Sequence, residues 1–583
     1  MTALARHHLQ KRAGSAPSCG CGGPVLSGIA AQLELDADLL DPTPRPRPPQ
    51  TRTGTIVIRG ATVLTIDEHF SEAEAIAIRG SHIVAVGSEA EVREVAGDDA
   101  EVIDRTGATI LPGFIEPHAH LLPTALLDSW EDVGPFRFDT VDEVVAHLCS
   151  LDTPADGGWI TGRQFDPSLQ AGPDELTTDL LDTVSTTTPI VIMNASGHFA
   201  YVNSAALEAA GITADTPDID GSPYGRFTDG TPNGVLKGQG SMMSVLTLNP
   251  GIRTLDIIGL ARRVGERAAA AGVTTICDQG TGFLLGAGDV GLFETLAAEG
   301  ALSTRLRYSL SDNHGDAFDL AGVVPGAGDE LVRATGWKIV ADGSNQGRTG
   351  FHRDPYLGTD DRGIAYVEPD VLIEKARLRA SRGWQVVIHA NGDQAIDNTL
   401  AALSAAVDAG EPDRRHRIEH CSILHDEQIA EIARLGVSPS FLIGHVYFWG
   451  QAFRDDIFGL AKAEMLDRTA SCSAAGIRWT VHSDEMVTPM GPLRCIHNAV
   501  TRSLWREPDF VLNPAERVDV EAAIRSVTSD AAWQCHSDHE IGSLEPGKLA
   551  DFVILDRDPR QVDPTDLLDI EVLETWMDGE RRF

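Results

Sequence analysis

Two histidines at the end of the stretch LPGFIEPHAH, residues 111–120, have the spacing of a metal-binding pair. Phe114 and Ile115 predict a short buried strand, and His118 and His120 follow at its end. In a strand, residues i and i+2 project from the same face, and histidine is the commonest metal ligand near neutral pH. Both imidazoles could therefore hold one ion, although an isolated His-x-His pair is as often two ordinary histidines.

Four further residues of ligand type follow short apolar runs, and each of them begins a polar loop. They are Lys338 in GWKIVADGS, His389 in VVIHANGD, His420 in RIEHCS and Asp484 in WTVHSDE. Any one of them alone would be an ordinary polar residue. Because all four follow the histidine pair on successive predicted strands, they indicate a metal site at one edge of a sheet.

The elements that must position these residues alternate between helix and strand. ARRVGERAAAAGV (261–273) has a helical composition and precedes the apolar TTICDQG, and the same alternation recurs at 371–393 and 426–445. This pattern predicts repeated βα units around a parallel sheet. Since the candidate residues lie at strand ends, where barrel active sites are found, we expect an α/β fold with a (β/α)8 TIM-type barrel rather than an open doubly wound sheet.

The spacing of the candidate residues also predicts an insertion. In all, 218 residues separate His120 from Lys338, whereas a barrel of this kind uses about 31 residues per βα unit. We expect the insertion at about 125–250, where it can cover the mouth of the barrel.

Both ends of the chain differ from the barrel in pattern. Residues 53–110 and 540–583 alternate β-branched and polar residues with glycine at the turns, which predicts a β-sandwich domain built from both chain ends. The barrel would then occupy 111–539. Residues 1–52 end in the run DPTPRPRPPQTR, which cannot hold regular structure, and are expected to be a flexible extension.

Composition and charge exclude several classes of partner. The chain of 583 residues carries a formal net charge of −39, which argues against nucleic acid or an anionic membrane as a partner. It has no apolar run of about 18 residues, and its basic start lacks an apolar segment behind it, so the cytoplasm is the expected location. Eight cysteines make no disulfide framework, and Cys19 and Cys21 are expected to be bystanders.

The motifs resemble those of the amidohydrolase superfamily, in the branch of YtcJ-like proteins and N-substituted formamide deformylases. The matching stretches are LPGFIEPHAH, KIVADGSNQGRTG, HANGDQAID, RIEHCS, HSDEM and IGSLEPGKLADFVILD. The resemblance covers nearly everything from about 54 to 583. One departure is Glu116, where the family often has aspartate.

The resemblance implies a binuclear metal site, usually zinc, at the mouth of the barrel. Its ligands would be His118, His120, Lys338, His389, His420 and Asp484. The first two histidines would hold one ion and the last two the other, and the lysine, carboxylated to N6-carboxylysine, would bridge them. The aspartate would bind the first ion and manage the proton of a bridging water. Such a site hydrolyses a small-molecule substrate, here a linear amide, formamide or carbamate.

Residues that could contact the substrate are less sharply defined. His198 in ASGHFAYVNSAAL resembles a family stretch in which the histidine reaches the substrate, with Asn203 as support, although a helix-capping loop explains it as well. Trp159 and His445 could form aromatic walls, or belong to the core. The last two candidates are Arg348, which could steady an anionic group or hold its own loop, and His482, which shares a strand face with Asp484.

Three alternatives remain beside this interpretation. A mononuclear deaminase of the superfamily would place a glutamate three residues after the third histidine, where this chain has Gly392. Hydrolysis of an ester, lactone or phosphoester would use the same metals and stays open. A non-catalytic assembly protein would have lost ligands, and none of the six positions is substituted. The sequence is compatible with dimers or larger assemblies and leaves the native metal undetermined.

Overall fold

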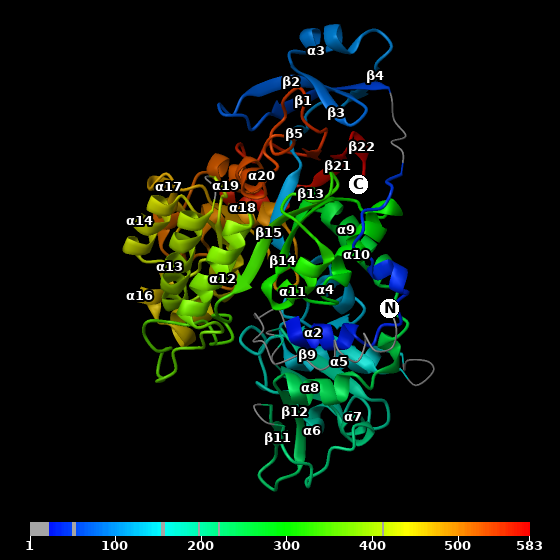
Figure 1. Cartoon of the computed structure of the whole chain (residues 1–583), viewed down its shortest axis with the longest axis vertical. Coiled ribbons are helices and arrows are strands. Elements are labelled where there is room, and N and C mark those ends of the chain that lie inside the picture. The colour runs from blue at the N-terminus through cyan, green and yellow to red at the C-terminus, as the bar shows by residue number, and fades with distance from the viewer. Residues whose placement is uncertain are drawn as a thin grey trace.

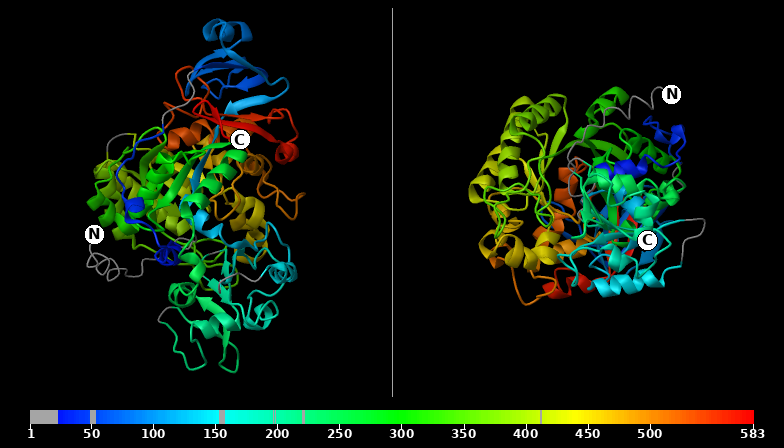
Figure 2. Two further views of the ribbon diagram at one scale, coloured as in Figure 1. Left: turned by 90° about the vertical axis from the view of Figure 1, so that its right-hand side faces the viewer. Right: turned by 90° about the horizontal axis from the view of Figure 1, so that it is seen from below.

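The computed structural model describes residues 23–48, 54–152, 158–195, 197, 199–219, 222–410 and 413–583. Three β-sheets follow one another along the long axis of the molecule (Figure 1). A sheet from both ends of the chain lies at one end, a parallel barrel sheet occupies the middle, and a third sheet lies at the opposite end. Figure 2 shows the same arrangement from the side.

The middle sheet has eight parallel strands in the order β19-β18-β17-β16-β15-β14-β13-β6. Its edges approach each other at a parallel bridge between Ala119 and Glu485, so the barrel is nearly closed. The α/β prediction of a TIM-type barrel is confirmed. Its strands are β6 (Phe114–Ala119), β13 (Val273–Thr281), β14 (Arg305–Ser311), β15 (Val332–Val340), β16 (Gln385–Ala390), β17 (Arg417–His420), β18 (Ser438–Phe441) and β19 (Thr480–Val481).

The barrel strands are buried on both faces. Their sequences are therefore continuous apolar runs rather than alternating apolar and polar residues. Every residue of β6, β13, β16 and β17 is buried. The helices that follow the strands shield the outer face with their apolar sides. Among them are α9 (Ile257–Ala270), α10 (Gly288–Ala298), α12 (Pro369–Ser381), α13 (Asp393–Ala409) and α14 (Asp426–Leu435).

The sheet from the chain ends, here called the terminal sheet, has the order β22-β21-β20-β5-β1-β2-β3, with β4 paired to β1. Strand β5 pairs antiparallel with β20, which joins the N-terminal and C-terminal segments. All eight strands belong to one branched, hydrogen-bonded sheet. They are β1 (Thr55–Leu64), β2 (Glu72–Arg79), β3 (His82–Gly87), β4 (Glu101–Asp104), β5 (Thr109–Pro112), β20 (Phe552–Leu555), β21 (Val572–Met577) and β22 (Glu580–Arg581).

The third sheet, here called the cap sheet, lies between β6 and β13 in the sequence, where the length of the chain predicts an insertion. Its order is β11-β12-β10-β9-β8-β7. It contacts the barrel mouth, since the Trp449 indole N–H donates to Asp166 Oδ2 at 3.2 Å and the Gln164 side chain donates to the carbonyl of Met486. The strands are β7 (Glu131–Asp132), β8 (Ile160–Phe165), β9 (Ile190–Asn194), β10 (Phe199–Val202), β11 (Tyr224–Arg226) and β12 (Pro232–Lys237).

Residues 23–48 pack against the rest of the molecule, in contrast to the flexible extension expected from the sequence. Helix α2 (Gly23–Ala30) buries Leu26 and Ile29 completely. Further along, Arg47 pairs with Glu294 of α10 at 2.8 Å. Burial of apolar side chains therefore stabilises the position of this segment. The proline-rich run at its end gave no indication of this. Cys19 and Cys21 lie outside the described residues. In the part of the chain that the structure describes, no helix is long and apolar enough to cross a membrane.

A buried arginine connects the barrel to the terminal sheet. Arg305, the first residue of β14, is 0% exposed, and its guanidinium donates to Asp551 Oδ2 at 2.6 Å and to Oδ1 at 3.0 Å. It also pairs with Asp578, between β21 and β22. Removal of one partner from such a buried pair leaves an uncompensated charge.

Replacing Arg305 with alanine should therefore lower the free energy of unfolding by about 3–5 kcal/mol. Chemical denaturation followed by circular dichroism measures this as a lower unfolding midpoint. Arg581→Ala is the matched control, because that side chain is 60% exposed and lies 3.6 Å from Glu574; it should cost at most about 1 kcal/mol. Equal midpoint shifts in the two variants would contradict the assignment.

Candidate metal centre

A small cavity at the carboxyl ends of the barrel strands brings together all six residues that the sequence analysis selected as metal ligands. Its volume is about 20 Å³, enough for one water molecule. The six residues are at most 5% exposed. The complete lining is His118, His120, Lys338, Ser344, Gln346, His389, Asn391, His420, Leu442, His445, Asp484 and Val487.

Backbone conformation aims two of these residues into the cavity. His420 and Asp484 have φ values of +65° and +52°, in the left-handed region that non-glycine residues rarely adopt. In a regular strand, neighbouring side chains point to opposite faces. The left-handed backbone at His420 breaks this alternation in β17, so that both Glu419 and His420 contact His118. Strained conformations of this kind cluster at functional sites, where the surrounding structure stabilises them.

Two charged residues of β17, Arg417 and Glu419, determine which nitrogen of His118 carries the proton. The Arg417 guanidinium donates to both Glu419 carboxylate oxygens, at 2.7 and 2.9 Å. Glu419 Oε2 in turn lies 2.5 Å from His118 Nδ1. A carboxylate only accepts hydrogen bonds, so Nδ1 carries the proton and Nε2 keeps its lone pair. Burial, together with the nearby Lys338 charge, holds the pKa of His118 well below its ordinary value, and the ring is therefore neutral.

The lone pair on His118 Nε2 faces Asp484 Oδ1 at 3.4 Å, and His120 Nε2 lies 3.3 Å from the same oxygen. A neutral imidazole lone pair and a carboxylate oxygen repel each other unless a cation lies between them. Asp484 Oδ1, Lys338 Nζ and His420 Nδ1 are buried and have no hydrogen-bond partner among the described residues. The donor atoms of His118, His120 and Asp484 lie within 4.8 Å of one another, so the residues present fit a metal ion.

The second pair of histidines lies on the adjoining strands β16 and β17. The rings of His389 and His420 are 4.4 Å apart. His389 Nε2 is 3.1 Å from the carbonyl oxygen of Gly343, an acceptor, which leaves Nδ1 with a lone pair. Burial, followed by the Lys338 charge, lowers the pKa of His389 to about 3. Burial also lowers the pKa of Lys338 to about 8, against the opposing charges of Glu419 and Asp484.

Two buried glutamates hold the segment that carries Asp484. Glu116 accepts hydrogen bonds from the Ser483 N–H at 3.1 Å and from its hydroxyl at 2.7 Å. Burial raises the pKa of Glu116 to about 8. On the other side of Asp484, Glu485 accepts from Arg267 Nη2 at 2.9 Å. The longer side chain at position 116, a departure from the aspartate often found there, therefore reaches the backbone of the neighbouring loop.

The candidate substrate residues separate into two groups. His445 lines the cavity, and the His482 ring stacks on His118 with centroids 4.6 Å apart. Asn203 instead lies within the cap sheet region, where its side chain caps α7 (Ser204–Ala209) by accepting from Ala206 N. Arg348 donates to the carbonyl of Asp456 at 3.0 Å and so holds a loop.

Two further candidates are not among the residues that the structure places at the cavity. Trp159 is buried in the large hydrophobic core and does not line the cavity. His198 lies outside the described residues. Arg417 and Glu419 were not among the residues predicted from the sequence, although opposite charges two residues apart in the buried stretch RIEH were a signal for a buried ion pair.

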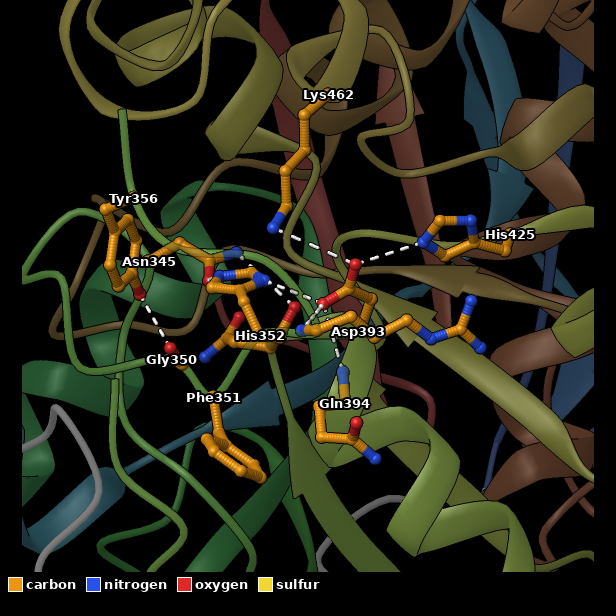
Figure 3. A network of polar contacts seen from close by, with 12 residues as sticks. Asn345, Gly350, Phe351, His352, Tyr356, Asp393, Gln394, His425 and Lys462 are labelled. Atoms are coloured by element: carbon orange, nitrogen blue, oxygen red, sulfur yellow. Dashed lines mark hydrogen bonds and ion pairs between the residues drawn. The ribbon is translucent and has the colours of Figure 1, made fainter. Parts of the chain in front are cut away.

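A polar network around Asp393 connects the loops that follow β15, β16, β17 and β18 (Figure 3). Asp393 Oδ1 lies 3.1 Å from His352 Nδ1 and accepts from Arg353 N at 2.8 Å. Its Oδ2 lies 3.0 Å from His425 Nε2 and 3.8 Å from Lys462 Nζ. Asp393 thus joins four loops beside the cavity through one buried carboxylate.

Comparison with known proteins assigns the family. A model of the amidohydrolase family matches residues 101–583. The chain belongs to the amidohydrolase family. An N-substituted formamide deformylase of Arthrobacter pascens is 29% identical over 91% of this amidohydrolase and 99% of the relative. YtcJ of Bacillus subtilis is 27% identical over 89% of this chain and 98% of its own length.

A solved structure shares the fold of this amidohydrolase. A metal-dependent hydrolase of Pyrococcus horikoshii superposes with a TM-score of 0.70, covering 88% of this chain and 99% of that protein, at 21% identity. This likeness shows a shared fold, and the match over residues 101–583 shows the family.

Glu419→Gln should weaken metal binding by this amidohydrolase by about 10–100-fold, because a neutral amide holds the His118 tautomer less firmly and leaves Arg417 without its counter-charge. Competition with a chromophoric chelator measures the affinity. Glu431→Gln is the matched control, since that glutamate pairs with Arg434 on the surface of α14. A folded Glu419→Gln protein with unchanged affinity would disprove the role given to Glu419.

Asp393→Asn should lower the thermal midpoint of this amidohydrolase at pH 7. Burial alone would raise the pKa of Asp393, but the hydrogen bond from His352 and the Lys462 charge hold it well below its ordinary value. The carboxylate therefore stabilises the fold above the unfolded pKa of about 4, and the stabilisation is lost as pH falls below that value.

The difference in thermal midpoint between wild type and Asp393→Asn should accordingly shrink as the pH is lowered from 5 to 3. Asp408→Asn, at the exposed end of the same helix α13, should differ little from wild type at any pH. If the difference in thermal midpoint between wild type and Asp393→Asn stays constant with pH, the charge of Asp393 is not what stabilises these loops.

Proposed function

We propose that this amidohydrolase cleaves a non-peptide C–N bond in a small molecule, namely a linear amide, a formamide or a carbamate. The observation that carries the proposal is the buried cluster of ligand-type residues in which the His118 Nε2 lone pair faces Asp484 Oδ1 at 3.4 Å. The resemblance over nearly the full chain to an N-substituted formamide deformylase supports the bond type.

The proposed ligands divide into two sets. His118, His120 and Asp484 would hold one divalent ion, and His389 and His420 a second. Imidazole nitrogen and carboxylate oxygen are ligands that zinc prefers, so zinc is the metal we propose. When bound, such ions polarise a carbonyl group and lower the pKa of water.

Lys338 is the proposed bridging ligand. An ammonium group cannot bind a cation, whereas a carbamate offers two anionic oxygens. Carboxylation forms an N–C bond between the neutral amine and carbon dioxide and releases one proton. Lys338 Nζ is buried, has no hydrogen-bond partner among the described residues and lines the cavity. Its lowered pKa of about 8 increases the neutral fraction that this reaction consumes.

Asp484 is the proposed proton carrier. Burial would raise the pKa of its carboxyl group, but the neighbouring His120 and the Lys338 charge hold it below the ordinary value. The group is therefore ionised at neutral pH and able to accept a proton from the attacking water. It then returns the proton to the leaving nitrogen as a general acid.

The size of the cavity favours a small acyl group. The space between the proposed ligands is about 20 Å³, the size of a water molecule, and a formyl group is the smallest acyl group that could enter it. The rest of the substrate would lie outside this space, towards the barrel mouth, where Gln164 and Asp166 of the cap region make contacts.

The deaminase alternative has no residue to support it. Its glutamate would occupy position 392, but a Cβ at Gly392 would lie 2.0 Å from the carbonyl oxygen of Phe351. That distance is far below van der Waals contact, so no side chain fits there. Ester, lactone or phosphoester hydrolysis would use the same donor atoms, and no observation favours it over C–N cleavage.

Elemental analysis should find about two zinc ions per chain in the wild-type protein. Lys338→Ala should retain fewer ions and lose at least about 100-fold in kcat/KM on a panel of N-aryl and N-benzyl formamides, amides and carbamates. Lys237→Ala, which removes a half-exposed lysine of the cap sheet paired with Glu175, should keep both properties. One ion per chain, unchanged by Lys338→Ala, would contradict the bridge, and a metal-free active protein would contradict the metal centre.

A further inference from the structure

His445 forms part of the cavity wall without belonging to the proposed ligand set. It lies in the first turn of α15 (Gly444–Ala452), directly after β18, and is 1% exposed. The rings of Phe453 and Trp449 pack against it, with centroids 5.6 and 6.1 Å away. Its orientation is therefore fixed by packing, and its imidazole borders the space where the substrate must react.

A chain of hydrogen bonds decides which nitrogen of His445 carries the proton. The Asn391 Nδ2 amide donates to the Gly343 carbonyl oxygen at 2.9 Å. The reverse orientation of the amide would bring two oxygens together at that distance, so Asn391 Oδ1 must face Ser422. The Ser422 hydroxyl donates to Oδ1 at 2.7 Å. A hydroxyl has one proton to donate, and here Asn391 receives it.

Ser422 Oγ also lies 3.1 Å from His445 Nδ1. Because its proton is already engaged, the oxygen accepts from His445, and Nδ1 is the protonated nitrogen. Burial lowers the pKa of His445 to about 4, so the ring is neutral at physiological pH. The second nitrogen, Nε2, therefore carries a lone pair and acts only as a hydrogen-bond acceptor.

We propose that His445 Nε2 accepts the N–H of the scissile amide and selects substrates that have one. This inference rests on the proposed function and names its substrate class: secondary formamides and amides, in preference to esters and N,N-disubstituted amides. The apolar neighbours Leu442 and Val487 offer no alternative donor on their part of the wall.

The physical basis of the selection is the unpaired acceptor. A substrate without an N–H leaves the Nε2 lone pair buried and unsatisfied, and sites built around a substrate N–H or O–H reject analogues that lack it far more strongly than apolar pockets reject a missing methylene. Gln346 also lines the cavity, but its amide can rotate to present either a donor or an acceptor, so it cannot enforce this choice.

Three matched probes test the inference on the zinc-loaded 583-residue enzyme: N-benzylformamide, N-benzyl-N-methylformamide and benzyl formate. The wild type should hydrolyse the first with a kcat/KM at least about 100-fold above that of the N-methyl compound. The ester is compared after division by its uncatalysed rate, because esters are intrinsically more reactive. His445→Leu should lose this preference, because its kcat/KM for N-benzylformamide falls while its kcat/KM values for the other two probes change only a few-fold.

Ser422→Ala provides a second variant, since it frees the His445 tautomer without removing the ring and should reduce the preference partly. His147→Leu, which alters a histidine of the cap region paired with Glu131, should keep the wild-type preference. A wild-type enzyme that accepts the N-methyl compound equally well, or a His445→Leu variant that slows all three probes equally, overturns the inference but leaves the hydrolase standing. No turnover of any probe overturns the C–N hydrolase proposal for this class, and the inference with it.

Discussion

The metal centre depends on one buried chain of charge, from Arg417 through Glu419 to His118. Arg417 donates to both carboxylate oxygens of Glu419 in the barrel interior, and Glu419 in turn keeps the proton on His118 Nδ1. The lone pair of Nε2 then faces the carboxylate of Asp484. The lone pair and the carboxylate repel each other unless a cation lies between them. The buried side chains at this end of the barrel are therefore suited to hold a metal ion.

The loops around the cavity are held by buried polar contacts of residues that do not line the cavity themselves. Glu116 and Glu485 hold the backbone on either side of Asp484, while Asp393 gathers the loops after β15 to β18 (Figure 3). The contacts of Glu116 and Glu485 hold the residues on either side of Asp484, whose backbone is left-handed. Local strain at the site is thus offset by buried polar bonds nearby. The cap sheet contacts the barrel mouth through Gln164 and Asp166.

Much of the architecture could be predicted from the sequence because it rests on local patterns. Alternation of helices with fully apolar strands predicted the parallel barrel, and the excess of chain between His120 and Lys338 predicted the insertion that forms the cap sheet. The packing of residues 23–48 could not be predicted, because Leu26 and Ile29 are buried against distant parts of the chain. Asn203 and Trp159 were selected by motif, yet Asn203 caps a helix and Trp159 fills the core, contacts that no spacing reveals.

The sequence by itself determined which residue types stand at the strand ends, since parallel strands of a barrel carry their carboxyl ends to one face. It did not determine what each side chain does there. The tautomers of His118 and His445, the left-handed backbone at His420 and Asp484, and the lack of room at Gly392 depend on atoms contributed by segments up to several hundred residues apart. Which atom donates each hydrogen bond, and how much space each side chain has, is decided only when those segments pack together. These two properties determine which chemistry a set of suitable residues can perform.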